Sequence, residues 1–209
     1  MLDLLAPTAQ RLRARLRGNV LIELLPYPAS GLLLSLEYPA FARFGHSPLV
    51  GVRLLTARLE QLGFAADFDR PVVLIGFSQG ALVITETLAM PEDRRFAPGV
   101  APLSPNARRR VWAAVSVGNP SFRAGEPFND GTPSPGVSGM LARPFGALDS
   151  AGDVLVDLAE SDDVAAQHVR TSTMDGHLAY GRRGYPDRVV DWVMAKLDER
   201  TRLDAASAG

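Results

Sequence analysis

Cysteine is absent from this chain of 209 residues, and its 22 basic residues include one lysine, Lys196. Without cysteine the protein has no disulfide bond, no thiolate zinc site and no cysteine nucleophile. An excess of either charge is also missing, because 22 basic residues stand against 23 acidic ones. This balance argues against a nucleic-acid partner or an anionic membrane surface. No apolar run is long enough for a transmembrane helix, and no secretory signal is expected.

The composition is that of an ordinary globular protein, with 46% hydrophobic and 22% charged residues. We expect a single domain over residues 1–203 and a frayed tail over 204–209. Short apolar runs of strand type alternate with segments whose apolar residues recur at helical spacing. The predicted strands are 19–25, 71–75 and 111–117, the predicted helices are 4–16, 48–62, 81–90 and 186–197, and the predicted loops are 26–48 and 121–144. This alternation predicts an α/β fold with a mostly parallel central sheet flanked by helices.

The sequence GFSQG at residues 76–80 follows a predicted strand directly and precedes a helical pattern. In this context G-x-S-x-G is typical of a sharp strand-to-helix turn that lifts a serine hydroxyl above the sheet. The glycines remove side chains that would clash across so tight a turn. Ser78 is therefore the candidate nucleophile, and the backbone N–H of Gln79 is a candidate oxyanion donor. The alternative is an incidental glycine-serine turn at the end of a strand.

A serine nucleophile needs a base, and the chain has three histidines, His46, His168 and His177. His177 lies in the sequence GHLAYG at residues 176–181, just before the last predicted helix. That place fits the chain order serine, aspartate, histidine of an α/β-hydrolase. His168 follows a predicted helical segment, 162–167, and is interpreted as a surface residue. His46 precedes the serine and is at best a substrate contact, so His177 is the candidate base.

The carboxylate that orients the base is expected between the serine and the histidine, after a later strand. Five aspartates have suitable positions: Asp149, Asp153, Asp157, Asp162 and Asp163. Asp153 is preferred because the preceding glycine suits a loop at a strand end, and Asp157 is the main alternative. Asp162 and Asp163 are interpreted as solvated residues at the start of a helix.

Several other features have simpler interpretations. The run Arg108–Arg110 is expected to be a solvated helix end, with a phosphate or polysaccharide contact as the alternative. Trp112 and Trp192 are expected in the core. Phe77 and the loop 121–144 are candidates for an acyl groove. The sequence carries no metal-binding cluster and no phosphate loop, and ester hydrolysis by a serine needs no cofactor, so none is expected.

The motifs in their order resemble the cutinase-like serine esterases of the α/β-hydrolase superfamily. The motifs are GFSQGA at 76–81, VGNP at 117–120, GVSG at 136–139, AGD at 151–153 and GHLAYG at 176–181. Within that group, the pairing of GNP with GVSG and the lack of cysteine look most like the phage lysin B esterases, which act on mycolyl-arabinogalactan. Secreted cutinases are similar around GD and HLAYG but normally carry disulfides.

The resemblance implies a triad of Ser78, Asp153 and His177, in agreement with the choices above. The sequence YPAS at residues 27–30 resembles the Y-P-A turn of the family, so Tyr27 is a candidate substrate contact together with Phe77. The chain departs from the family pattern at its start, where a first strand normally ends in a turn that supplies a second oxyanion donor. We therefore expect an α/β-hydrolase fold that lacks the first strand.

The resemblance implies hydrolysis of lipid carboxylic esters through an acyl-enzyme, with mycolyl-arabinogalactan as a possible natural substrate in phage-mediated lysis. The protein would then be made in the cytoplasm and act at the host cell envelope. A cutinase or short-chain lipase is the alternative within the same class. A degenerate, non-catalytic module that binds the cell envelope is the alternative from a different class.

Overall fold

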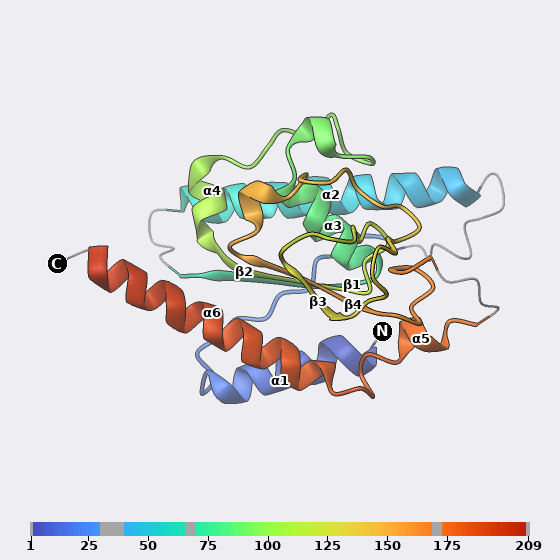
Figure 1. The fold of residues 1–209 in the computed structure, drawn as a ribbon. Coiled ribbons are helices and arrows are strands. Elements are labelled where there is room, and N and C mark those ends of the chain that lie inside the picture. Colours follow the sequence, from blue (N-terminus) through green and yellow to red (C-terminus); the bar gives the residue numbers. More distant parts are fainter. Residues whose placement is uncertain (1, 30–39, 66–69, 169–172, 208–209) are drawn as a thin grey trace.

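The computed structural model describes residues 2–29, 40–65, 70–168 and 173–207 (Figure 1). Its centre is a four-stranded sheet in the order β1-β2-β4-β3, in which every neighbouring pair is parallel. The strands are β1 Val72–Phe77, β2 Val111–Val117, β3 Asn129–Thr132 and β4 Leu155–Glu160. This architecture confirms the predicted α/β fold.

Helices cover both faces of the sheet (Figure 1). Helices α2 (Ala40–Phe64), α3 (Gln79–Leu88) and α4 (Pro105–Arg110) lie on one face. Helices α1 (Leu2–Arg15) and α6 (Tyr185–Ser207) lie on the other, and the short α5 (Asp175–Leu178) lies beyond the carboxyl ends of the strands. Among the described helices, none is long and apolar enough to cross a membrane.

The alternating direction of side chains along the central strands builds two apolar layers. Leu74 and Ala114 pack on one face with residues of α2 and α3, such as Leu59. Val115 and Val117 point to the opposite face and pack with residues of α1 and α6. Because both faces are covered, β2 is buried along almost its whole length, as its continuous apolar sequence predicts.

The structure corrects the prediction of a strand at 19–25. This segment has no regular secondary structure, and Leu21 and Leu24 are 77% and 82% exposed. Its apolar composition suits a strand, but a strand also needs a neighbour to complete its backbone hydrogen bonds. β1 is therefore an edge of the sheet in the described part of the chain, and no described strand precedes it.

A strand that the sequence did not predict, β3, lies within the expected loop 121–144. Its sequence NDGT is short and polar, so it lacks the apolar pattern of a buried strand. At Gly131 a Cβ atom would lie 2.1 Å from the carbonyl oxygen of Ala159, and φ is +103°. Glycine therefore permits the close approach of β3 to β4.

Two helices are longer than predicted. α2 begins at Ala40 and continues through Pro48, where the sequence predicts its start. Proline has a helical φ but removes one backbone donor and crowds the carbonyl four residues earlier, so Pro48 suits a helix start. In the structure Pro48 lies inside α2 instead. α6 runs beyond its predicted end to Ser207. The segment 162–167, in contrast, forms turns in place of the predicted helix.

A buried ion pair holds the long loop after β2 against the sheet. The Arg143 guanidinium donates to the Asp157 carboxylate at 2.8 Å and to the carbonyl oxygen of Ser121 at 3.0 Å. The other oxygen of Asp157 accepts from the Ser116 hydroxyl at 2.7 Å. The two charged side chains are 5% and 0% exposed, so neither charge is solvated by bulk water.

We expect Asp157→Ala to lower the free energy of unfolding by about 3–5 kcal/mol, because it leaves the buried Arg143 charge without its partner. Urea denaturation measures the change. Asp153→Ala removes an equal charge from an exposed site and should change stability by about 0.5 kcal/mol or less. Equal effects of the two substitutions would contradict the assigned role of the ion pair.

Candidate active site

Ser78 lies on a strained turn between β1 and α3. Its φ and ψ are 55° and -118°, a conformation that residues with a side chain rarely adopt. The turn is tight, because a Cβ atom at Gly76 would lie 2.5 Å from the backbone of Gly80. The Ser78 N–H donates to the carbonyl oxygen of Val117 at the end of β2, 2.9 Å away. Strain of this kind is concentrated at functional sites, and the turn has the geometry that GFSQG predicts.

The structure brings His177 to Ser78 from the far part of the chain. The His177 Nε2 and Ser78 Oγ atoms are 2.8 Å apart. His177 lies in α5 and is 2% exposed, and its ring stacks on Phe77 at a centroid distance of 4.8 Å. Gly176 lets α5 approach the preceding loop, since a Cβ atom there would lie 2.1 Å from the carbonyl oxygen of Asp162. The predicted pairing of Ser78 with His177 is thus present.

The carboxylate that contacts His177 belongs to Asp163. Its Oδ1 atom lies 2.8 Å from Nδ1 of His177 and also accepts from the N–H groups of Ala165 and Ala166 at 2.7 and 3.0 Å. Asp163 is fully buried. Burial by itself raises the pKa of this carboxyl, but the hydrogen bond and charge of His177, together with the other donors, hold the pKa below its ordinary value.

The prediction that Asp153 contacts His177 is wrong, because the two lie at opposite ends of the sheet. Asp153 precedes β4, whereas Asp163 follows it. The strands are parallel, so their carboxyl ends meet at the edge where Ser78 lies. The alternative, Asp157, is bound to Arg143 in the interior.

The neighbouring aspartates have different environments. Asp162 is exposed and pairs with Arg183 at 2.6 Å, which agrees with a solvated residue. The same interpretation of Asp163 is wrong, since it is buried. The sequence does contain a pattern that indicates the position of Asp163, because residues 154–159 are mostly apolar and suit a strand. A strand there predicts a carboxylate among the residues just after Glu160.

The sequence interpretation missed Tyr180, which extends the hydrogen-bonded chain by one member. Its hydroxyl donates to Asp163 Oδ2 at 2.7 Å and accepts from the N–H of Glu160 at 3.0 Å. The ring is 1% exposed and packs edge-on against Tyr185. Burial, followed by the negative charge of Asp163, raises the pKa of Tyr180 well above its ordinary value, so its hydroxyl remains a donor. Its place in GHLAYG, three residues after His177, was the available signal.

Of the two candidate substrate contacts, Phe77 is buried and Tyr27 is partly buried. Phe77 is 6% exposed and supports the ring of His177. Tyr27 packs between α2 and α3, close to Gly51 and Gly80, and burial raises its pKa to about 12. Phe77 therefore has a packing role, whereas the substrate contact of Tyr27 stays a prediction.

Gln79, the candidate oxyanion donor, follows Ser78 as the first residue of α3. Helix geometry leaves the first N–H groups of a helix without an intrahelical acceptor, and the macrodipole favours negative charge there. The Gln79 side chain is buried, and its Oε1 atom accepts from the Ser47 hydroxyl at 2.8 Å. This contact fixes the Gln79 side chain.

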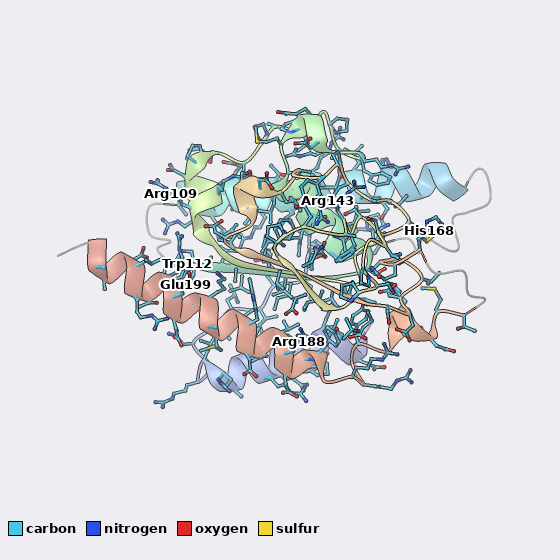
Figure 2. The ribbon with its side chains drawn as sticks, viewed as in Figure 1. Arg109, Trp112, Arg143, His168, Arg188 and Glu199 are labelled. Atoms are coloured by element: carbon cyan, nitrogen blue, oxygen red, sulfur yellow. The ribbon has the colours of Figure 1, made fainter. Side chains whose placement is uncertain are left out.

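The remaining histidines are exposed. His46 lies in α2, and His168 follows the turn after Asp163 (Figure 2). Over the part of the chain that the structure describes, no three histidine, aspartate or glutamate side chains are grouped as a metal site.

The ionisation of Asp163 makes the stability of the folded protein depend on pH. Its folded pKa lies below the ordinary 3.8, so its stabilising contribution is present above pH 3.8 and is lost as pH falls through the folded value. Tyr180→Phe removes one donor to the carboxylate. We expect the variant to be less stable than the wild type by about 1–2 kcal/mol at pH 7 and by less at pH 3.

Urea denaturation between pH 3 and 7 measures this difference. Its control is the same Tyr180→Phe substitution in an Asp163→Asn background, where the pH-dependent part should vanish because residue 163 no longer titrates. A stability difference that is independent of pH in both backgrounds would mean that Tyr180 acts only through packing.

The fold is shared with solved esterase structures. An acetylxylan esterase determined at 0.90 Å superposes with a TM-score of 0.74 at 22% identity, covering 92% of this chain and 89% of that one. The catalytic core domain of acetyl xylan esterase from Trichoderma reesei gives 0.71 at 22% identity, covering 91% and 90%. A cutinase-like protein from Cryptococcus sp. gives 0.63 at 18% identity, covering 92% and 85%.

Sequence comparison identifies the family. Cutinase 11 from Verticillium dahliae is 29% identical over 147 residues, which are 68% of this chain and 46% of that protein. The chain therefore spans about half the length of this curated relative. The profile of the family described as Cutinase matches residues 65–197, a range that includes Ser78, Asp163 and His177. The chain belongs to the cutinase family.

Proposed function

We propose that the protein is a serine esterase that hydrolyses carboxylic esters through an acyl-enzyme on Ser78. The observation that carries this proposal is the continuous hydrogen-bonded chain from Ser78 through His177 to Asp163. Serine hydrolases on unrelated folds activate their hydroxyl with this order of groups. Membership of the cutinase family supports an ester as the bond that is cleaved.

In this mechanism His177 Nε2 takes the proton of Ser78 Oγ as the oxygen attacks the ester carbonyl. Asp163 accepts from Nδ1–H, which fixes the tautomer with a bare Nε2 and stabilises the imidazolium that forms. The imidazolium then gives its proton to the oxygen of the leaving alcohol. Water attacks the acyl-enzyme in the second half of the reaction, with the same histidine as base and then as acid.

Gln79 is the proposed oxyanion donor. Negative charge develops on the carbonyl oxygen during attack, and a donor fixed beside the serine stabilises it more than the neutral ester. The position of Gln79 at the start of α3 supports this role. Among the described residues we assign no second donor.

The acyl group is proposed to be apolar, as in a lipid ester. Leu178 follows His177 directly and is 48% exposed, and Val137 of the GVSG motif is 36% exposed. An apolar chain that covers such side chains gains free energy from their removal from water. These residues take the place of Phe77 as candidate substrate contacts, and Tyr27 remains a candidate.

The natural ester is a finer question. The GNP and GVSG motifs favour mycolyl-arabinogalactan and a role in phage-mediated lysis at the host envelope. The family match also supports the alternative within the same class, in which the protein is a cutinase or a short-chain lipase. Solved structures with this fold include acetyl xylan esterases, so an acetylated polysaccharide belongs in the same substrate panel.

The triad is tested with p-nitrophenyl esters on a matched pair of variants. Asp163→Asn keeps the size of the side chain but favours the wrong tautomer of His177, and we expect kcat to fall about 10³- to 10⁴-fold. Asp153→Asn makes the same change at the other end of the sheet and should leave kcat unchanged. Ser78→Ala should abolish turnover and labelling by a fluorophosphonate.

Each outcome separates the competing hypotheses. Loss of activity in Asp153→Asn but not in Asp163→Asn would overturn the assigned carboxylate. Fluorophosphonate labelling at another serine would overturn the nucleophile. A folded wild-type protein that neither turns over an activated ester nor reacts with the probe would favour the non-catalytic envelope-binding module.

The apolar substrate contact is tested by chain length. We expect Leu178→Ser to raise KM for long-chain p-nitrophenyl esters about fivefold and to leave KM for the acetate nearly unchanged, because only the longer acyl chain reaches it. The control is Leu54→Ser, which makes the same change at an exposed leucine of α2. An equal change for acetate and long chains would assign Leu178 to the support of His177 instead.

A further inference from the structure

Gln167 is a buried polar side chain that the proposed mechanism does not use. It lies four residues after Asp163 and is 0% exposed. Its Oε1 atom accepts from the N–H of Ser134 at 2.7 Å, and its Nε2 atom donates to the carbonyl oxygens of Val137 at 3.1 Å and Ala166 at 3.0 Å. The oxygen and both N–H groups of the amide therefore have partners. A buried amide with this many hydrogen bonds fixes the backbone segments that it joins.

The first of these segments is a turn in the loop between β3 and β4. The N–H of Val137 donates to the carbonyl oxygen of Ser134 at 3.2 Å, and Gly136 has φ +73°. The sequence SPGV, with proline second and glycine third, is typical of a type II turn. The amide of Gln167 contacts the N–H of the first residue and the carbonyl of the last, so it closes the open side of the turn. Gln167 thus joins the GVSG motif to the segment that follows the carboxylate.

The second segment is the turn that carries Asp163, in which two peptide groups are held at both ends. The N–H of Ala166 donates to Asp163 Oδ1 at 3.0 Å. The carbonyl of the same peptide group belongs to Ala165 and accepts from the N–H of Met140 at 3.0 Å. In the next peptide group, the N–H of Gln167 donates to the carbonyl oxygen of Asp163 at 2.9 Å, and the carbonyl accepts from the Gln167 side chain. The direction of the donors to the carboxylate therefore depends on contacts from outside the turn.

Glycine allows the GVSG motif to lie close to this turn. At Gly139 a Cβ atom would lie 2.3 Å from the carbonyl oxygen of Pro120 and 3.1 Å from that of Ala165. The N–H of Gly139 donates to the carbonyl oxygen of Phe122 at 2.9 Å. The motif is thus packed between the loop after β2 and the turn after β4. Because the chain has no cysteine, hydrogen bonds and packing hold this turn without a disulfide.

We propose that Gln167 is a positioning residue, which fixes the turn at 163–167 and so sets the hydrogen bond between Asp163 and His177. Its hydrogen bonds are to backbone atoms, so it acts through the orientation of the turn. Asp163 Oδ1 accepts from two N–H groups of the turn and lies 2.8 Å from Nδ1 of His177. A change in the direction of these backbone donors therefore moves the oxygen that the imidazole contacts. This inference rests on the proposed function, because it concerns the same carboxylate.

The test is Gln167→Glu, which keeps the size of the side chain but offers at most one donor to two carbonyl oxygens. The readout is the proton NMR resonance of Nδ1–H of His177, which a short hydrogen bond to a carboxylate moves far downfield. We expect the wild type to show this resonance and Gln167→Glu to move it upfield, toward its position in Asp163→Asn. With p-nitrophenyl acetate we expect kcat to fall about 10- to 100-fold, because a small misplacement of the triad slows the reaction, and KM to stay nearly unchanged.

Two control variants separate positioning from charge and from stability. Gln61→Glu makes the same substitution at an exposed residue of α2. Leu59→Ala leaves a cavity in the core and lowers the melting temperature without touching the turn. Both controls, measured well below their melting temperatures, should keep the wild-type resonance and the wild-type kcat.

The outcomes distinguish this role from a purely structural one. A folded Gln167→Glu protein with a lower melting temperature but an unmoved resonance would overturn the proposal, and so would an equal shift in Leu59→Ala. If Gln167→Glu does not fold, Gln167→Met removes the three hydrogen bonds without adding a charge and is judged by the same resonance. The resonance requires no turnover, so its shift in a protein without esterase activity would support the positioning of the carboxylate while contradicting the proposed function.

Discussion

The parallel alignment of β1, β2 and β4 is the constraint on which the site depends. It puts the carboxyl ends of three strands at one edge, so the residues just beyond each end become neighbours despite long separations in sequence. Ser78 follows β1, the Gly118 turn follows β2, and Asp163 follows β4. Gly118 has φ +60°, and a Cβ atom there would lie 3.0 Å from Asp163 Oδ2 and 3.2 Å from His177 Cε1. The turn after β2 thus provides the space in which the carboxylate meets the imidazole.

The buried carboxylate shows how a charge is kept inside this protein. Asp163 receives two backbone N–H groups, one imidazole and one phenol, so both of its oxygens are hydrogen-bonded. Asp157, also buried, is stabilised differently, by a full positive charge on Arg143 and a hydroxyl. Neutral donors leave the first carboxylate free to interact with a histidine whose charge changes, whereas an arginine holds the second permanently in the structure.

The local parts of the site could be predicted from sequence, and the parts set by strand register could not. Ser78 belongs to a motif that specifies its own turn, and His177 follows from chain order and a glycine-flanked segment. The carboxylate depends on where a strand ends, and β4, with Asp157 inside its apolar run, was not recognised as a strand. The glycine before Asp153 suits a loop, so the sequence alone favours Asp153 over Asp163. Tyr180 lies in the GHLAYG motif, but its role depends on the hydrogen bond from its hydroxyl to Asp163, which the spacing of apolar residues does not predict.

Helix α6 is a continuous helix that touches both ends of the molecule. Near its start, Tyr185 donates to Glu160 and packs on Tyr180, while Arg200 lies over Trp112 fifteen residues later. At 1.5 Å per residue the helix sets these two contacts about 22 Å apart. It therefore acts as a rigid spacer, because a kink or a deletion within it would shift Tyr185, which packs on Tyr180, relative to Arg200, which lies over Trp112. The register of one helix thus ties the geometry of two distant surfaces to each other.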